Sequence, residues 1–456
     1  MRSVLAIARL AIRQCIRWRL ASVVILVYLL VVPSLPFVLE ADGTLVGQLR
    51  LTLTWSLFFA ALLLGLLTVI LATGLLWREI AGRQIYILDT KPVHRWQVFL
   101  GKYLGMMALV GGLLLLMGAF LYVVLLASWR SPRWGDAERA EARSSVLTCR
   151  RGYGPEVPNR DALAAEVYSR MKADGALPEV GTPAEITAEI RRRMNQWQAG
   201  QGGAVDWTFS GLPAPRGLSG ESLTLRFQYF SSSMSAGDEL QGMWEFGRPD
   251  EEGYARAVTF FPIGSYHEFD FPAAAVTPGG TLALRFSNIH PAPLPAVFSV
   301  DGGVEVLGRS GSFGGNLARA LAAVFFLLAF LGALGLFAST FLSGPVAAVV
   351  VLSLLLIGAG STTVVSALQR KVEPRISYPG GEPGPADYIT LGAMRGIVFA
   401  LPNAARYFPA SRLQLGREVS WSWLALQFGE LVVLRGGLLS LLGCWILSRR
   451  EIAGAT

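Results

Sequence analysis

The sequence predicts a polytopic α-helical membrane protein with six transmembrane helices and an inserted extracytoplasmic α+β domain containing a β-sandwich or jelly roll. Three observations carry this prediction. Apolar residues make up 52% of the 456 positions and charged residues only 16%, which is typical of a membrane protein with a soluble part attached. Several apolar runs reach the roughly 20 residues that a helix needs to cross a bilayer. The central stretch 129–315 contains no such run.

The charge of the chain is divided between these two parts. Residues 129–315 hold 18 Lys/Arg and 22 Asp/Glu, whereas the remainder holds 22 and 10. The positive excess therefore lies beside the apolar runs, where the preference for Lys and Arg on the cytoplasmic side of a membrane explains it. It does not indicate a nucleic-acid partner. The three cysteines and three histidines are widely separated and predict neither a disulfide framework nor a metal site.

The first part, residues 1–128, is predicted to hold an amphipathic helix and three spans. Residues 2–19 place Arg9, Arg13 and Arg17 four positions apart on one helical face, which favours a helix lying on the cytoplasmic membrane surface. The alternative is the basic start of a signal peptide, which is disfavoured because the next apolar run is long and more spans follow. The three spans are expected at residues 20–39, 54–77 and 103–128.

A short basic segment, residues 78–102, separates the second and third spans. It carries five Lys or Arg residues against two acidic ones, so the positive-inside rule places it in the cytoplasm. Ile80, Ile85 and Leu88 would form the apolar side of a helix over 78–88, which Pro92 ends. A membrane protein has little reason to build such a loop unless something docks there, although an ordinary solvated loop is the simpler alternative.

Residues 129–315 are expected to form the extracytoplasmic domain. Its first part, 155–200, has the pattern of two helices. Its second part, 206–309, alternates apolar and polar residues in at least five short segments between Gly/Pro turns, which predicts an antiparallel sandwich or jelly roll. We interpret Trp244, Tyr254, Tyr266 and Phe269 in these segments as core side chains in preference to a ligand surface.

The last part, residues 316–456, is predicted to hold three more spans and an outer re-entrant or interfacial segment, 369–424. Charged residues within a span usually face a cavity or a protein partner. Glu430 and Arg435 are therefore candidates for a translocation path or a dimer seam. The alternative is a later start of the span, with Arg435 extending outward to the interface. These spans are expected at residues 316–341, 346–368 and 430–447.

The order of spans predicts the topology. Alternation from a cytoplasmic N-terminus places segment 78–102 and both termini inside and residues 129–315 outside a cell inner membrane. Every strongly basic short segment then falls in the cytoplasm, in agreement with the positive-inside rule. The long inserted domain is free to cross despite its charge, because long domains translocate largely regardless of charge.

Segment 78–102 and the parts around it resemble the permease subunit of the type-2 ABC exporter family. In that family the loop after the second span reads as an acidic residue, a Gly with a basic residue, Pro-x-x-Arg, and then Leu-Gly-Lys. The matching residues here are Glu79, Gly82, Arg83, Pro92, Arg95, Leu100, Gly101 and Lys102. Leu401–Pro409 and Arg449–Glu451 are also similar to the family. The resemblance covers residues 1–128 and 316–456 and does not extend to the insert.

The resemblance implies an N-terminal elbow helix, a second permease copy and a coupling helix that enters a groove on a cytoplasmic ATPase. No Walker A motif occurs in the sequence, so ATP and Mg are expected on the partner chain, with no catalytic or cofactor site here. The alternative function is a non-transporting transducer that relays ATPase motion to an extracytoplasmic partner through residues 129–315. The implied ATPase-coupling residues are Arg78, Glu79, Gly82, Arg83, Pro92, Arg95 and Lys102.

Overall fold

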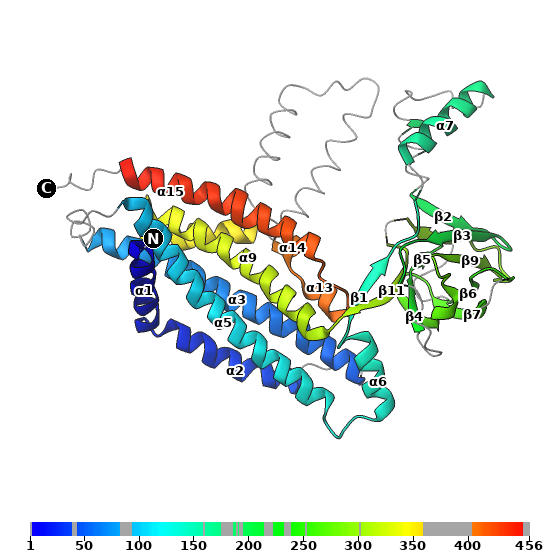
Figure 1. Cartoon of the computed structure of the whole chain (residues 1–456), viewed down its shortest axis with the longest axis horizontal. Helices are drawn as coiled ribbons and strands as arrows, with labels where there is room; N and C mark the ends of the chain where they lie inside the picture. The colour runs from blue at the N-terminus through cyan, green and yellow to red at the C-terminus, as the bar shows by residue number, and fades with distance from the viewer. Residues whose placement is uncertain are drawn as a thin grey trace. The chain divides into compact units, whose positions relative to one another are not determined.

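The chain folds into two compact units in a computed structural model (Figure 1). The helical unit combines Met1–Cys149 with Gly311–Thr456, and the β-rich unit is Arg150–Ser310. Helix α6 (Asp136–Ser145) packs against α3 and belongs to the helical unit, although the sequence placed it in the insert. The structure describes residues 2–38, 43–82, 94–157, 160–174, 186–187, 190, 195–213, 222–231, 239–250, 253–300, 302–358 and 404–449.

The helical unit begins with two helices joined at a bend. α1 (Arg2–Arg17) and α2 (Leu20–Val38) differ in direction by 60°. Arg19, with φ of 57°, provides the left-handed residue between them. The basic stretch therefore forms a helix distinct from the first apolar run, as the sequence predicted. In Figure 1, α1 lies at one end of the bundle and at an angle to the long helices.

Long apolar helices form the body of this unit. Their packed side chains create one continuous core, in which Leu64, Met106 and Leu328 are almost fully buried. Gly335 on α9 allows α3 to approach, since a Cβ there would lie 2.7 Å from that of Ala72, and Gly332 leaves room for Met106 of α5, 2.8 Å from where its Cβ would lie. The helices are α3 (Leu45–Ala81), α5 (Arg95–Trp129) and α9 (Phe313–Ser339).

The last span begins earlier than predicted. α14 (Trp421–Gln427), the π-helix η2 (Phe428–Gly436) and α15 (Gly437–Arg449) form one candidate span of 29 residues. The prediction that it starts near residue 430 is wrong because Trp421–Gln427, too short for a span alone, continues directly into it. The Ser420 hydroxyl caps this helix and accepts a hydrogen bond from the Trp423 N–H over 3.3 Å.

The described residues contain four helices long and apolar enough to cross a membrane, or five if α1 and α2 together make one span. A shorter apolar helix, Gly344–Gly358, covers the start of the predicted fifth span. The remainder of that span and most of segment 369–424 lie outside the described residues. Six spans therefore stay a prediction. Two short helices, α12 (Ala404–Tyr407) and α13 (Ala410–Gln414), precede the last span.

The β-rich unit contains antiparallel sheets. Their strand orders are β1-β11-β4-β8, β2-β10-β5 and β3-β9-β6-β7. A jelly-roll topology stays a prediction. The strands are β1 (Cys149–Tyr153), β2 (Gln196–Ala199), β3 (Ala204–Phe209), β4 (Ser222–Phe227), β5 (Tyr229–Phe230), β6 (Glu239–Phe246), β7 (Ala255–Pro262), β8 (His267–Pro272), β9 (Leu282–Asn288), β10 (Ala296–Ser299) and β11 (Val304–Gly311).

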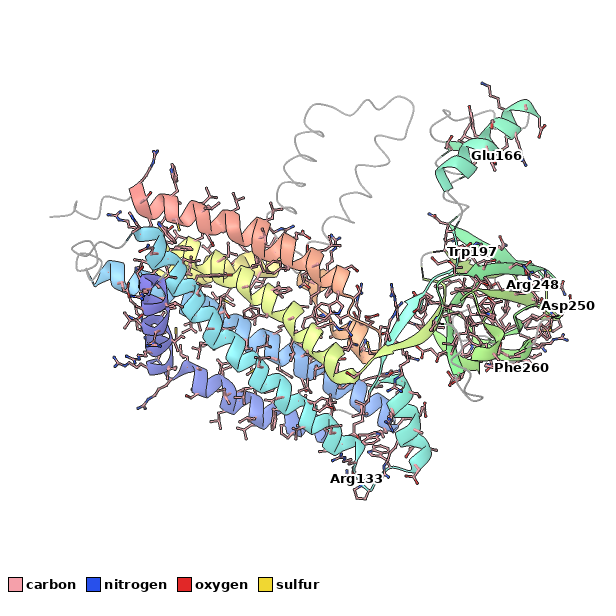
Figure 2. The ribbon with its side chains drawn as sticks, in the orientation of Figure 1. Arg133, Glu166, Trp197, Arg248, Asp250 and Phe260 are labelled. Atoms are coloured by element: carbon pink, nitrogen blue, oxygen red, sulfur yellow. The ribbon has the colours of Figure 1, made fainter. Side chains whose placement is uncertain are left out.

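The helical prediction for 155–200 is correct at its start and wrong at its end. α7 (Arg160–Ala173) is helical, but Gln196–Ala199 pairs with β10 as strand β2. Trp197 packs edge-on against Trp207, with ring centroids 5.6 Å apart (Figure 2). This pairing and ring contact outweigh the weak local preference for helix.

An aromatic cluster fills the β-rich unit. Trp244 is fully buried and lies 4.6 Å from Phe227 and 4.7 Å from Phe286 between ring centroids. Phe269 is half-buried and packs against the same cluster. The interpretation of Trp244 and Phe269 as core residues is therefore confirmed. The same interpretation is wrong for Tyr266, which is half exposed beneath the Arg226 guanidinium. Tyr254 is only partly buried, and its hydroxyl donates to the Glu245 carboxylate.

Candidate functional site

The segment predicted to dock a partner, residues 78–102, connects α3 to α5 in the sequence. α3 continues to Ala81, so Arg78 and Glu79 lie in its last turns. The expectation of a separate helix starting at Arg78 is therefore wrong, because the span helix runs through this position. Gly82 follows and is exposed, and its N–H donates to the Arg78 carbonyl oxygen over 2.9 Å.

The other side of the segment begins α5. Arg95 is the first residue of the helix, and Lys102 lies about two turns inside it. The Arg95 guanidinium donates to the carbonyl oxygen of Leu447 over 2.7 Å. It thereby satisfies one of the carbonyls left open at the C-terminal end of α15. Two further predicted residues, Arg83 and Pro92, lie outside the described residues.

A buried ion pair joins the two helices just inside the segment. Lys102 Nζ lies 2.6 Å from Glu79 Oε1, and the two side chains are 3% and 10% exposed. Lys102 also donates to the Leu75 carbonyl oxygen over 3.0 Å. Gln14 on α1 donates to the same Glu79 oxygen over 3.4 Å. Glu79 and Lys102 thus face the helix bundle, where they hold α3 to α5 and are not accessible to a partner protein.

Helix α1 packs against α5 beside this ion pair. Gly101 and Gly105 on α5 let it approach closely, because a Cβ on Gly101 would lie 2.8 Å from Ile7, and one on Gly105 would meet the Ala8 backbone. Ser3 at the start of α1 donates to the Gln97 side chain over 3.1 Å. The close contact therefore extends along one side of α1.

The far end of α1 is fixed to α3. The Trp18 ring fills the space over Gly74, where a Cβ would lie 2.8 Å away. The Arg78 guanidinium stacks over the same ring, 4.1 Å from its centroid. Arg78 therefore contacts α1, and its charge lies at the junction between helices.

Four helices thus meet where the described parts of α3 and α5 end and begin, and we call this meeting point the junction. It consists of the ends of α3 and α5, the whole of α1, and the last turn of α15. A displacement of residues 82–94 would act on α3 and α5 directly, and on α1 and α15 through the contacts of Gln14, Trp18 and Arg95. Packed helices transmit such displacements as units.

Glu430 and Arg435 form a second ion pair in the last span. Arg435 Nη2 lies 2.7 Å from Glu430 Oε1, and both residues belong to η2. Residues five apart align in a π-helix, which is why these two side chains meet. Arg435 lies within the helical candidate span that begins at Trp421. The alternative, in which Arg435 extends outward to the interface, stays open.

The Glu430 carboxylate also lies beside Tyr407 at the end of α12. Burial, followed by the hydrogen bond and charge of Glu430, raises the pKa of Tyr407 to about 12. The phenol thus stays neutral and can donate to the carboxylate. Whether Glu430 and Arg435 line a path or a dimer seam stays a prediction.

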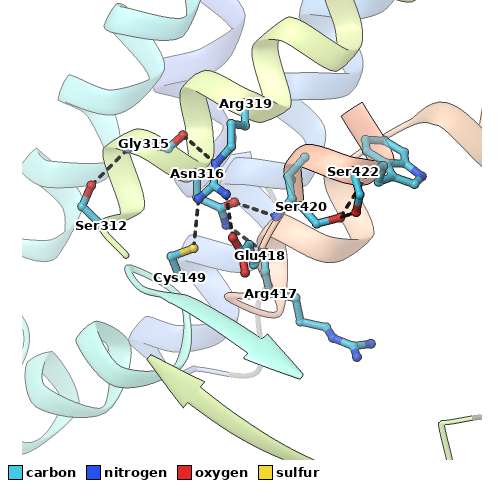
Figure 3. A network of polar contacts seen from close by, with 11 residues as sticks. Cys149, Ser312, Gly315, Asn316, Arg319, Arg417, Glu418, Ser420 and Ser422 are labelled. Carbon is cyan, nitrogen blue, oxygen red and sulfur yellow. Dashed lines mark hydrogen bonds and ion pairs between the residues drawn. The ribbon is translucent and has the colours of Figure 1, made fainter. Parts of the chain in front are cut away.

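A polar network lies at the start of α9 (Figure 3). The buried Asn316 side chain donates to the Arg417 carbonyl oxygen over 2.7 Å and accepts from the Val419 N–H over 2.8 Å. Arg319 pairs with Glu418 at 2.8 Å and donates to Cys149 Sγ over 3.3 Å. The network fixes the entry to the last span against α9, and no pattern in the sequence predicted it.

Asn316→Ala is expected to destabilise the helical unit by about 1–3 kcal/mol, because two buried backbone groups lose their partner. Thermal unfolding in mild detergent measures this as a lower Tm. Ser422→Ala, at an exposed position of the same network, is the control and is expected to change stability by about 0.5 kcal/mol or less. Equal effects of the two substitutions would contradict the role assigned to Asn316.

Comparisons of this chain with known protein families, curated proteins and solved structures find no match. Within the described parts of the chain, no cluster of three or more His, Cys, Asp or Glu side chains is placed to hold a metal ion. The candidate site therefore rests on the junction and its contacts.

Proposed function

We propose that this chain is the membrane-spanning permease subunit of a type-2 ABC transporter. It couples ATP hydrolysis by a separate cytoplasmic ATPase to export of a substrate across the inner membrane, together with a second permease copy. The observation that most supports the proposal is the junction, which joins both ends of the basic segment to four helices. This is the mechanical connection that a coupling element requires.

The contacts divide the predicted coupling residues into two groups. Glu79 and Lys102 are buried together, Arg78 stacks on Trp18, and Arg95 caps α15. These four residues therefore transmit motion within the chain. The surface offered to the ATPase is then Gly82 with the residues that follow it, including Arg83 and Pro92. Binding of ATP closes the ATPase dimer, and the segment passes that motion to α3 and α5.

The proposal predicts a stoichiometric ATPase partner. We expect the tagged chain, purified in mild detergent from its native membranes, to bring with it a Walker A protein with ATPase activity. Arg83→Glu is expected to lower the amount of this partner by roughly tenfold or more, because charge reversal at an interface costs several kcal/mol. Arg95 is a poor choice for this test, because its loss would disturb α15.

Arg133→Glu is the matched control. Arg133 is exposed in the turn after α5, at the end of that helix away from the junction (Figure 2). The partner is expected to remain bound to this variant. A clean preparation without an ATPase, or equal loss of the partner from both variants, would contradict the proposal.

The second candidate is a non-transporting transducer. It is favoured by one observation: the β-rich unit has its own aromatic core and is compact in itself. Replacing Arg150–Ser310 by a short Gly/Ser linker separates the two functions. A permease is expected to lose specificity or delivery, whereas a transducer is expected to show the same phenotype as loss of the whole gene.

A further inference from the structure

Helix α1 has three distinct faces, and only one of them packs against other described residues. Val4, Ala11 and Cys15 are buried toward the bundle. The remaining surface is open and carries both charged and apolar side chains. Its charged part, which we call the basic strip, consists of Arg2, Arg9, Arg13 and Arg17.

The basic strip is unusual because its charges are not neutralised. The four arginines recur at helical spacing, so they lie along one side of α1. All four are exposed, and none of them forms an ion pair or hydrogen bond with the described residues. Four guanidinium groups along one helix repel one another in the absence of an anionic partner.

An apolar strip runs beside the basic strip. Leu5 and Ile16 are 67% and 54% exposed, and Ile12 is half-buried between them in the sequence. Their helical spacing places them on one side, adjacent to the arginines and away from the buried face. A surface that offers guanidinium groups and aliphatic side chains together matches a phospholipid, which has a phosphate headgroup and acyl chains.

The connection of α1 to α2 supports the same occupant. α2 is an apolar helix that begins three residues after α1, following the 60° bend. Where α2 enters a bilayer, an amphipathic helix joined to it by such a bend lies at the level of the headgroups. This arrangement would place the basic strip in the headgroup layer, with Leu5 and Ile16 directed toward the acyl chains.

We propose that α1 is a binding surface for anionic phospholipids. The arginines bind the phosphodiester headgroups, and the apolar strip contacts the upper part of the acyl chains. This inference concerns α1 and the bilayer alone and does not depend on the transport proposal. Since α1 also contacts Glu79 through Gln14 and Arg78 through Trp18, bound lipid would hold the junction in place.

The test is lipid binding by the full chain. The protein is purified in a neutral maltoside detergent and titrated with phosphatidylglycerol or phosphatidylcholine, and bound lipid is counted by native mass spectrometry. Phosphatidylglycerol is expected to bind about tenfold or more tightly. Each arginine near an anionic headgroup contributes about fivefold, so changing Arg9, Arg13 and Arg17 to Gln is expected to weaken its binding by about tenfold to a hundredfold.

Two further variants separate charge from a general effect on folding. Changing the same three arginines to Lys keeps the charge and is expected to retain the preference for phosphatidylglycerol. The matched control changes three exposed arginines of the β-rich unit to Gln, which removes the same charge and leaves lipid binding unchanged. These control residues are Arg248, Arg256 and Arg309.

The apolar strip has its own readout. Leu5→Ser with Ile16→Ser is expected to weaken phosphatidylglycerol binding, and glycerol phosphate, which lacks acyl chains, is expected not to compete. Equal binding of the two lipids, unchanged binding by the Gln variant, or equal loss from the control would overturn the proposal. Loss of a co-purifying protein from the Gln variant with full retention of lipid would overturn it in favour of a protein partner.

Discussion

Lys102→Met is expected to destabilise the helical unit by about 3–5 kcal/mol. The substitution leaves the Glu79 carboxylate buried without its cation, and an uncompensated buried charge has a cost of this size. Lys102 also loses its bond to the Leu75 carbonyl oxygen. The protein is heated in mild detergent, and its unfolding is monitored through the reaction of the buried Cys15 thiol with a fluorescent maleimide.

The double variant shows whether the charge causes the loss. Adding Glu79→Gln to Lys102→Met removes the unpaired carboxylate and is expected to recover much of the stability, since replacement of a whole buried pair is often neutral. Arg143→Met, at an exposed position of α6, is the control, with an expected change of about 0.5 kcal/mol or less. An equally unstable double variant would contradict the account of the pair.

Trp244→Ala is expected to destabilise the β-rich unit by about 3–5 kcal/mol, the usual cost of removing a large aromatic side chain from a core. Trp244 is fully buried and contacts the rings of Phe227, Phe286 and Trp207. Limited proteolysis of the full chain measures this, because cleavage within Arg150–Ser310 increases as the unit opens.

Phe260→Ala is the matched control for this substitution. Phe260 lies on β7, the strand next to that of Trp244, and is 57% exposed (Figure 2). Its loss is expected to change proteolysis little, since substitutions at exposed positions rarely exceed about 0.5 kcal/mol. Similar sensitivity of the two variants would show that the aromatic cluster does not hold the unit together.

The sequence predicted most of the long helices because a bilayer requires long apolar runs, which are local and easily seen. It also predicted β4, β5, β7, β8, β9, β10 and β11 from their alternating residues, but did not single out β1, β3 or β6. It missed β2, because the partner strand β10 lies about a hundred residues away. It missed the start of the last span because Trp421–Gln427 is too short to be recognised without the helix that follows.

The candidate site was predicted as a region and not as a set of contacts. The basic segment was identified from its position between two apolar runs. The pairing of Glu79 with Lys102 could not be foreseen, since it depends on how α3 packs against α5.

We propose that a cytoplasmic ATPase docks on the basic segment. The most direct test of this docking is a photo-crosslinking amino acid placed at Arg83, activated in intact membranes, with the same amino acid at Arg133 for comparison. We predict a crosslink from position 83 to a protein with a Walker A motif, and none from position 133. A crosslink from position 83 to no nucleotide-binding protein, while the chain remains folded in the membrane, would contradict the account.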